Sequence, residues 1–264
     1  MTPSSQVRQF VFACTCLALF ACESMRTPPT DTEILDSYKA YNQRVDRVLA
    51  PLLKANTDLC PKTKPDSGAR LHRLADYPKR LRPTAKTLFM ARDTPSVFYT
   101  LPDSPAAKAG LKPGDEVDEA HLNTIGKENI ICAYGFKIRF EQDANAYADG
   151  ANIIVTSGLL RAIDDETLSL VLAHELAHNV RAHAGKPLKD EFEREADRYA
   201  LYFLARAGLD YQNVAHLHAA THQPHQGRAQ LSPSRKNRQA YFKTIIKEID
   251  ALITKGRPLN PTKP

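Results

Sequence analysis

The sequence predicts an α+β protein that is mainly helical and contains a small sheet. Apolar residues recur at helical spacing in three long segments, short β-branched runs lie between the first two of them, and 42% of the 264 residues are hydrophobic. A chain of this length and composition can bury one core and a small second module. The net charge of +6 is spread along the chain and no recognition motif accompanies it, so a soluble protein that does not bind nucleic acid is expected.

Residues 1–21 are predicted to be an export signal. Arg8 precedes an apolar run at 10–21 that is too short to span a bilayer as a permanent helix. The sequence "LFAC" resembles the lipobox of bacterial lipoproteins, which makes Cys22 the expected lipidation site and a lipid-anchored, periplasmic protein the expected product. Glu23 does not match an inner-membrane retention signal, which favours the outer membrane. An ordinary cleaved signal with an incidental Cys22 is the alternative.

The next segments are expected to be a tether, a helix and a connection. Residues 22–32 include a stretch rich in proline and threonine, which is typical of a tether. Residues 33–60 contain an amphipathic helix that packs on the rest of the protein, because apolar side chains recur at steps of three and four: Ile34, Tyr38, Tyr41, Val45, Val48 and Leu52. Residues 61–87 are rich in Lys, Arg, Pro and Asp and are expected to form a connecting segment.

The stretch "SPAAKAGLKPGDEV" at 104–117 combines a short Ala-rich helical turn, Gly110 as its terminator, and a turn into a strand. It resembles a PDZ domain of the kind attached to bacterial proteases. The resemblance implies a truncated, β-rich PDZ-like insert over 88–126, which would bind extended peptide ends at a sheet edge. A purely structural insert is the alternative, because no glycine-containing carboxylate loop precedes "SVFYTL".

Two cysteines remain after the signal and the lipidation site are set aside. Cys60 and Cys132 are expected to form a disulfide bond in an oxidising compartment, and two separate buried thiols are the alternative.

A predicted helix that begins at Asp164 or Asp165 and runs to about Ala184 carries the main chemical signal, "VLAHELAHNVRAH". At 100° per residue, His174, Glu175 and His178 share one arc of the helix, so both imidazoles can reach one ion with the carboxylate beside them. His183 is expected to point the opposite way. Apolar residues cover the remaining directions, so the histidines would be buried, and a metal ion would offset the cost of burying them.

The sequence "HELAH" matches the H-E-x-x-H signature of zinc peptidases, which need a third ligand. Arg181 and Ala184 occupy the positions that a metzincin fills with Gly and His, so that class is excluded. The predicted helix at 187–208 offers three glutamates. We choose Glu193, beside the apolar face, as the ligand, over Glu191 and Glu195, and Asp197, one turn later, as the acceptor of an imidazole N–H. An ordinary charged helix flank is the alternative.

These motifs, with "EREAD" and "NAYADGANIIVTSGLL", resemble metallopeptidase family forty-eight, which includes HtpX-like proteases and CaaX prenyl endopeptidases, and more narrowly its periplasmic lipoprotein branch. The resemblance implies a zincin-like metallopeptidase domain at 129–252, followed by a disordered tail at 253–264. It also implies one Zn²⁺ held by His174, His178 and Glu193, with Glu175 as catalytic base. A substrate strand would lie along an edge formed by Asn152, Ile153, Ile154 and Val155.

The chain departs from the family pattern at one position. Many relatives carry a T-H-P-S segment with an arginine five residues after the proline, and here Ser232 replaces the histidine while Pro233, Ser234 and Arg238 match. The nearby His216, His218, His222 and His225 could substitute, although histidines in a polar segment are usually solvated.

Two functions from different classes are open on sequence alone. The first is a zinc endopeptidase of the bacterial cell envelope that hydrolyses misfolded or misassembled proteins by zinc-activated water and a glutamate base. The second is a low-turnover, zinc-containing binding or assembly factor for envelope proteins. Both take polypeptide partners, and the presence of Glu175 favours the enzyme.

Overall fold

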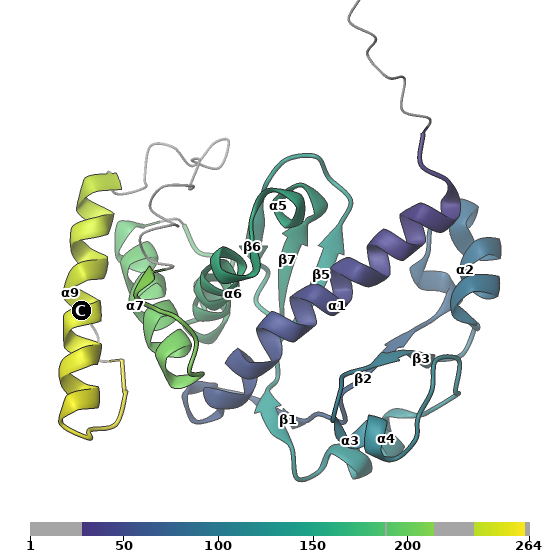
Figure 1. Ribbon diagram of the computed structural model, residues 1–264, viewed down its shortest axis with the longest axis horizontal. Helices are drawn as coiled ribbons and strands as arrows, with labels where there is room; N and C mark the ends of the chain where they lie inside the picture. The colour runs from purple at the N-terminus through teal and green to yellow at the C-terminus, as the bar shows by residue number, and fades with distance from the viewer. Residues whose placement is uncertain (1–27, 188, 214–234, 262–264) are drawn as a thin grey trace, which may run out of the picture.

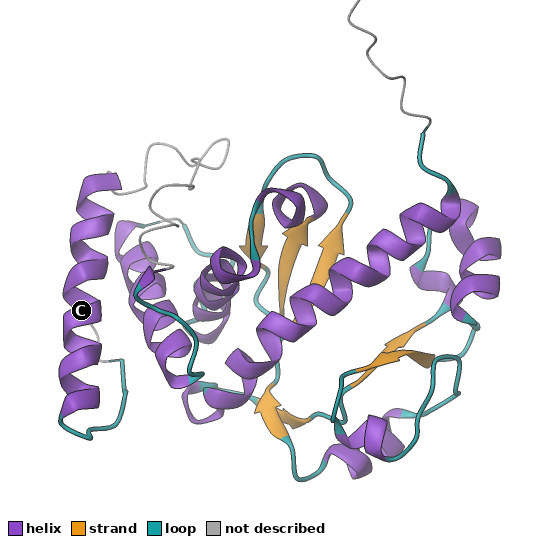
Figure 2. Cartoon of the chain, in the orientation of Figure 1, coloured by secondary structure: helices purple, strands orange, loops and turns teal. Residues whose placement is uncertain are grey.

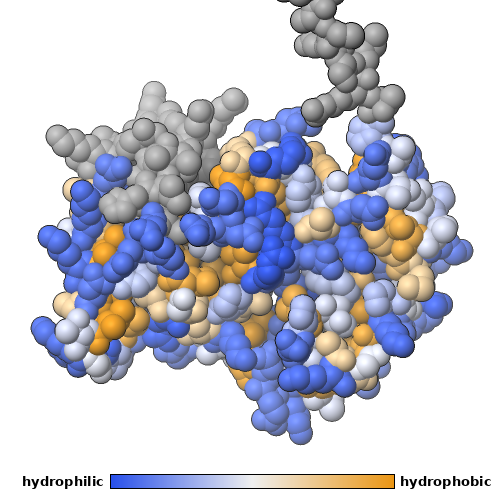
Figure 3. All heavy atoms as spheres, in the orientation of Figure 1, coloured by the Kyte–Doolittle hydropathy of each residue, from blue (hydrophilic) through white to orange (hydrophobic). Residues whose placement is uncertain are grey.

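The computed structural model describes residues 28–187, 189–213 and 235–261, which form helices and three small sheets (Figures 1 and 2). This confirms the α+β class. None of the helices within these ranges is long and apolar enough to cross a membrane. On the face drawn in Figure 3, hydrophobic residues form separate small patches among hydrophilic ones.

Helix α1 (Asp31–Ala55) confirms the predicted amphipathic helix and organises the molecule. Thr30 begins it, because its hydroxyl accepts a hydrogen bond from the backbone N–H of Glu33 while the Glu33 carboxylate accepts one from the backbone N–H of Thr30, at 2.7 Å. In Figure 1, α1 runs diagonally across the molecule, with α6 and α7 beside its C-terminal half and α2 beside its N-terminal end.

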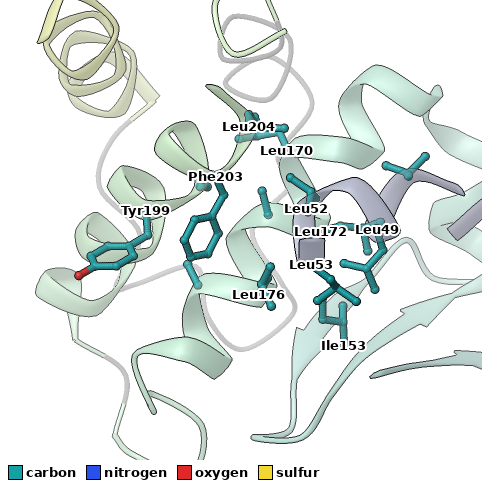
Figure 4. Packing of buried hydrophobic residues seen from close by; sticks show 14 of the residues in the cluster. Leu49, Leu52, Leu53, Ile153, Leu170, Leu172, Leu176, Tyr199, Phe203 and Leu204 are labelled. Carbon is teal, nitrogen blue, oxygen red and sulfur yellow. The ribbon is translucent and has the colours of Figure 1, made fainter. Parts of the chain in front are cut away.

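The main core lies where α1 crosses helices α6 (Asp165–Val180) and α7 (Asp190–Arg206). Figure 4 shows how three helices and strand β7 supply interlocking side chains: Leu49, Leu52 and Leu53 from α1, Leu170, Leu172 and Leu176 from α6, Phe203 and Leu204 from α7, and Ile153 from β7. Helix α9 (Arg235–Thr254) adds Phe242, Ile245 and Ile249 to the same cluster. Helix α6 is therefore buried nearly all round, as its apolar sequence predicts.

A three-stranded sheet lies next to α6. Its order is β5 (Gly135–Arg139), β7 (Asn152–Thr156) and β6 (Ala146–Ala148), with β5 parallel and β6 antiparallel to β7. Strand β7 is central, so the prediction that residues 152–155 form a free substrate edge is wrong. The reason is the turn at Asp149 and Gly150, which folds the short β6 back onto β7 and covers that edge. The short helix α5 (Ser157–Ala162) follows β7.

The segment between α1 and this sheet is more structured than the sequence suggests. Residues 61–87, expected to be a connection, supply β1 (Thr63–Pro65), β2 (Ala69–His72) and α2 (Arg82–Phe89). Strand β1 pairs with β4 (Ile130–Cys132) and β2 pairs with β3 (Ser96–Thr100), both antiparallel. The segment between α1 and the three-stranded sheet also contains the short helices α3 (Pro105–Lys108) and α4 (Glu119–Gly126). Its 3-10 turns lie at Thr57–Leu59, Leu74–Asp76 and Lys79–Leu81.

The predicted boundaries of the insert, 88–126, therefore exclude strand β2, although β2 pairs with β3 inside those boundaries. Within 88–126 the described elements are one strand, three helical pieces including the end of α2, and an isolated bridge between Ser96 and Glu116. These elements do not confirm the PDZ resemblance.

A buried ion pair joins this segment to α1. Arg70 of β2 donates from Nε to one Asp46 oxygen at 2.6 Å and from Nη2 to the other at 2.8 Å, and its Nη1 lies 2.8 Å from Asp66. The hydroxyl of Tyr99 donates to Asp46 at 3.1 Å. Asp46 is only 3% exposed, so Arg70 and Tyr99 together compensate a carboxylate that would otherwise be buried alone.

Two further contacts close the fold. Cys60 and Cys132 form a disulfide bond with a Cα–Cα distance of 5.6 Å, which confirms that prediction. Residues 255–261 are not the disordered tail expected from the sequence: Arg206 donates to the Leu259 carbonyl at 2.9 Å, and Leu259 packs on the main core. The apolar contact of Leu259 and this partly buried hydrogen bond hold residues 255–261 against the rest of the protein.

Candidate metal centre

Three predicted ligands meet at one point between α6 and α7. The Nε2 atoms of His174 and His178 lie 3.0 Å apart, and the two Glu193 oxygens lie 3.5 Å and 3.6 Å from them, respectively. Packing of α7 against α6 directs Glu193 towards the histidines. Of the three glutamates that the sequence offered, the structure therefore selects Glu193, as predicted.

The spacing of these atoms suits a tetrahedral zinc ion. Zinc bonds of about 2.0–2.2 Å require ligand atoms about 3.3–3.6 Å apart, since a tetrahedron's edge is about 1.6 times its bond length. The two Nε2 atoms are 3.0 Å apart, and each has one Glu193 oxygen at 3.5 Å or 3.6 Å, a different oxygen in each case; these distances lie at or near that range. With one atom taken from each residue, the three ligand atoms lie within 4.8 Å of one another. Two imidazoles and one carboxylate are also the donor set of many catalytic zinc sites, which keep a fourth position open. The residues present therefore fit zinc.

The other nitrogen of His174 has the carboxylate partner that the sequence predicted. Its Nδ1 lies 3.0 Å from Asp197 Oδ1, and Asp197 is 2% exposed. Arg238 of α9 holds Asp197 in turn, with Nε donating to Oδ2 at 2.8 Å and Nη2 to Oδ1. The sequence marked Arg238 only as a residue that matches the family pattern, and its contact with Asp197 required the docking of α9.

The structure corrects the expected direction of His183. Helix α6 ends at Val180, earlier than predicted, and Ala182 adopts the left-handed region with φ 53°. The chain therefore reverses, the His183 N–H donates to the His178 carbonyl at 2.9 Å, and the two Nδ1 atoms lie 3.1 Å apart. The predicted direction of His183 is wrong because it assumed that the helix continues past Val180.

Glu195, which the sequence placed away from the ligands, partners His183. One of its oxygens lies 3.0 Å from His183 Nε2, and the other accepts from Arg181 Nε at 2.9 Å. No local sequence signal indicated this contact, because it depends on the turn at Ala182 and on the packing of α7.

The electrostatic field of the centre favours a cation. Burial by itself would lower the pKa of His174, but hydrogen bonds and charge from Asp197 and Glu193 outweigh it and raise that pKa. Burial lowers the pKa of His178, and the neighbouring His174 adds to the effect. Burial would raise the pKa of Glu193, but His174 outweighs it and lowers that pKa. Glu193 and Asp197 thus favour a positive charge at His174.

Glu175, the predicted catalytic base, directly follows His174 on α6 and is 6% exposed. Its position beside the ligand is that expected from the H-E-x-x-H spacing, and its catalytic role stays a prediction.

Asn179, which the sequence did not single out, joins helix α6, which carries the two candidate histidine ligands, to the sheet. Its side-chain oxygen accepts from the Gly150 N–H at 2.7 Å, and its side-chain nitrogen donates to the Asn152 carbonyl at 3.1 Å. Gly150 has φ 97°, so it occupies a backbone region that favours glycine in the turn between β6 and β7. A polar residue among the buried positions near the end of α6 was the only signal for this role.

Several predicted residues lie outside the described ranges. These are Cys22, Ser232 and the histidines at 216, 218, 222 and 225. A cavity of about 780 Å³ lies beside α1, β1 and β2, and its lining does not include His174, His178 or Glu193.

Comparison with known proteins supports the same chemistry. A search of curated proteins gave no match. Residues 134–189 match the model of Peptidase family M48, over a stretch that carries the three-stranded sheet, His174, Glu175 and His178. The match ends just before Glu193, which the structure adds to the histidines. The segment that bears the histidine pair is therefore similar to metallopeptidase family M48.

Proposed function

We propose that this protein is a zinc-dependent endopeptidase that hydrolyses misfolded or misassembled polypeptides of the bacterial cell envelope. The observation that carries the proposal is the meeting of His174, His178 and Glu193 at one point, with Glu175 next to a ligand in the family M48 segment. A general base has a use in hydrolysis and none in mere binding, which favours an enzyme over a zinc-containing binding factor.

Different side chains of the protein have different roles in the proposed reaction. A bound zinc ion would supply the Lewis acidity that activates a water molecule and polarises the scissile carbonyl. Glu175 would act as the general base: its carboxylate would accept a proton from the attacking water and pass that proton to the leaving amine. Asp197 orients the ring of His174, and burial of the group excludes competing solvent.

The substrate is proposed to bind along β6. This strand is the outer one on its side of the sheet and contacts α6, whereas β7 is central. An extended polypeptide can pair with the outer edge of β6 by backbone hydrogen bonds, which place little constraint on its sequence. Such binding suits unfolded chains as a substrate class.

Location in the envelope is part of the proposal. The disulfide bond between Cys60 and Cys132 is typical of proteins from oxidising compartments. The predicted export signal at 1–21 and lipidation site at Cys22 favour a periplasmic enzyme anchored to the outer membrane.

The test combines metal content with peptidase activity. Purified wild-type protein should bind about one zinc and cleave an unfolded protein such as reduced casein. Glu175→Gln should keep the zinc and lose cleavage by about 100-fold or more. Glu166→Gln is the matched control, since Glu166 lies in the same helix but is exposed, and it should cleave normally.

Two outcomes would contradict the proposal. Equal cleavage by wild type and Glu175→Gln would exclude Glu175 as the base. Full zinc occupancy with no cleavage of any unfolded protein would instead support the binding factor.

A further inference from the structure

We propose that His183 is a positioning residue for the metal ligand His178, and that Glu195 and Arg181 hold His183 in that role. The inference rests on the proposed zinc centre and adds a second support to it, separate from the contact between His174 and Asp197.

Three contacts form a continuous chain of side chains. His178 Nδ1 lies 3.1 Å from His183 Nδ1, His183 Nε2 lies 3.0 Å from Glu195, and Arg181 donates to the other Glu195 oxygen at 2.9 Å. His178 directs its remaining nitrogen, Nε2, at His174 and Glu193. This series of contacts therefore begins at Nδ1 of the His178 ring, and the other ring nitrogen, Nε2, faces the proposed metal position.

Donor and acceptor roles along this chain are consistent in one arrangement. If His178 binds a metal through Nε2, its neutral ring carries its proton on Nδ1, which must donate. His183 Nδ1 then has to accept, so its proton sits on Nε2 and donates to Glu195. The Arg181 guanidinium balances the charge of Glu195. The ring N–H of each of the two histidines then has an acceptor, and the tautomer of His178 is set.

Packing keeps His183 in place without help from a metal. The residue is 6% exposed, and its ring stacks on Phe192 with centroids 4.5 Å apart and an interplanar angle of 18°. The turn at Ala182 and the hydrogen bond from the His183 N–H to the His178 carbonyl fix its backbone. The Arg181 guanidinium lies 5.0 Å from the Tyr199 ring centroid, which orients it towards Glu195.

The two histidine ligands are therefore supported differently. His174 meets a carboxylate directly, whereas His178 meets an imidazole that is itself bound to a carboxylate. Removing such an outer partner typically weakens metal affinity about 10–100-fold, because the ligand ring loses its fixed orientation and tautomer. His183 should therefore affect metal affinity although it does not touch the metal.

The test uses variants that distinguish the role of His183 Nδ1 as a hydrogen-bond acceptor from the packing of the ring on Phe192. His183→Phe keeps an aromatic ring against Phe192 but removes the acceptor, and it should weaken zinc binding about 10–100-fold in competition with a chromophoric chelator. His183→Asn places a side-chain oxygen near the former Nδ1 position and should recover much of that affinity. Co²⁺-substituted His183→Phe should also show an altered visible absorption spectrum, which a purely structural role would not produce.

The controls keep the inference falsifiable. His121→Phe changes an exposed histidine on α4 and should leave zinc affinity unchanged. Glu195→Gln, which does not alter the ring, should weaken zinc binding several-fold and decides the question if His183→Phe fails to fold. Wild-type affinity and an unchanged cobalt spectrum in these variants would overturn the inference, as would a wild-type protein that binds no zinc. Zinc binding without peptidase activity would refute only the proposed endopeptidase.

Discussion

Arg238 on α9 and Asp197 on α7 form a two-pronged ion pair, 41 residues apart in the chain, and they are 6% and 2% exposed. Asp197 also contacts His174, so the docking of α9 and the orientation of a metal ligand depend on one carboxylate. Stability and metal affinity should therefore respond together to changes at this pair.

Replacing Asp197 by Asn should lower zinc affinity about 10–100-fold, because the ligand loses a charged acceptor at Nδ1. Chelator competition measures the change. Glu191→Gln, at an exposed position on the same helix, is the control and should bind zinc as the wild type does. Unchanged affinity in Asp197→Asn would show that Asp197 does not support the ligand.

Replacing Arg238 by Met should lower the free energy of unfolding by about 3–5 kcal/mol, because it leaves the Asp197 carboxylate buried without its counter-ion. Urea unfolding measures the loss. The double variant Arg238→Met/Asp197→Asn should recover part of it, since no unpaired charge remains. If the single and double variants lose the same free energy of unfolding, the loss comes from packing and not from the unpaired Asp197 carboxylate.

Replacing Asn179 by Leu should raise KM for an unfolded protein substrate several-fold with little change in zinc affinity. The substitution removes both hydrogen bonds to the turn between β6 and β7, so the proposed substrate edge loses its fixed position relative to α6. Steady-state kinetics and zinc titration on the same preparation measure the two effects. A large loss of zinc with an unchanged KM would contradict this role.

Reduction of the bond between Cys60 and Cys132 should lower the free energy of unfolding by about 2–5 kcal/mol, because the cross-link restricts the unfolded chain. Urea unfolding with and without reductant measures it. The double variant Cys60→Ser/Cys132→Ser should be insensitive to reductant. A reductant effect of the same size in that variant would exclude this disulfide as its source.

Acidification should destabilise the segment around β2 through His72. Burial lowers the pKa of this imidazole to about 4, with Asp76 opposing and Lys39 adding to the shift. The ring stacks on Phe98 at a centroid distance of 4.8 Å, and its Nδ1 lies 2.6 Å from the Tyr77 hydroxyl. The unfolded chain, with an ordinary histidine pKa of about 6.5, binds the proton more readily. Stability is therefore complete above pH 6.5 and falls as the pH drops towards 4.

The loss through His72 should be about 1–2 kcal/mol between pH 7 and pH 5. Urea unfolding of wild type and His72→Phe at both pH values measures it, and the variant should lose less stability on acidification. His121→Gln, at an exposed histidine, should behave as the wild type does. The same pH dependence in wild type and His72→Phe would exclude His72 as the group responsible.

Local patterns in the sequence were sufficient for the class of fold, the long helices and most of the metal centre. The spacing of His174, Glu175 and His178 is a property of one helix, and the choice of Glu193 followed from the apolar face of the next. Both inferences need only helical geometry and the cost of burying polar groups, which are local. The disulfide bond followed from a count of cysteines, because only Cys60 and Cys132 remain after the signal and the lipidation site are set aside.

Only the tertiary structure decided which segments meet. It placed β7 between two strands, paired β2 with β3 across the predicted boundary of the insert, and brought Arg238 to Asp197. It also turned His183 towards His178, because a single left-handed residue, Ala182, ended the periodicity on which the opposite prediction relied. These contacts depend on turns and on the packing of segments far apart in the chain, and no local pattern in the sequence indicated them. The candidate ligands His174, His178 and Glu193 could thus be predicted from the sequence, whereas the groups that contact those ligands are determined by the tertiary structure.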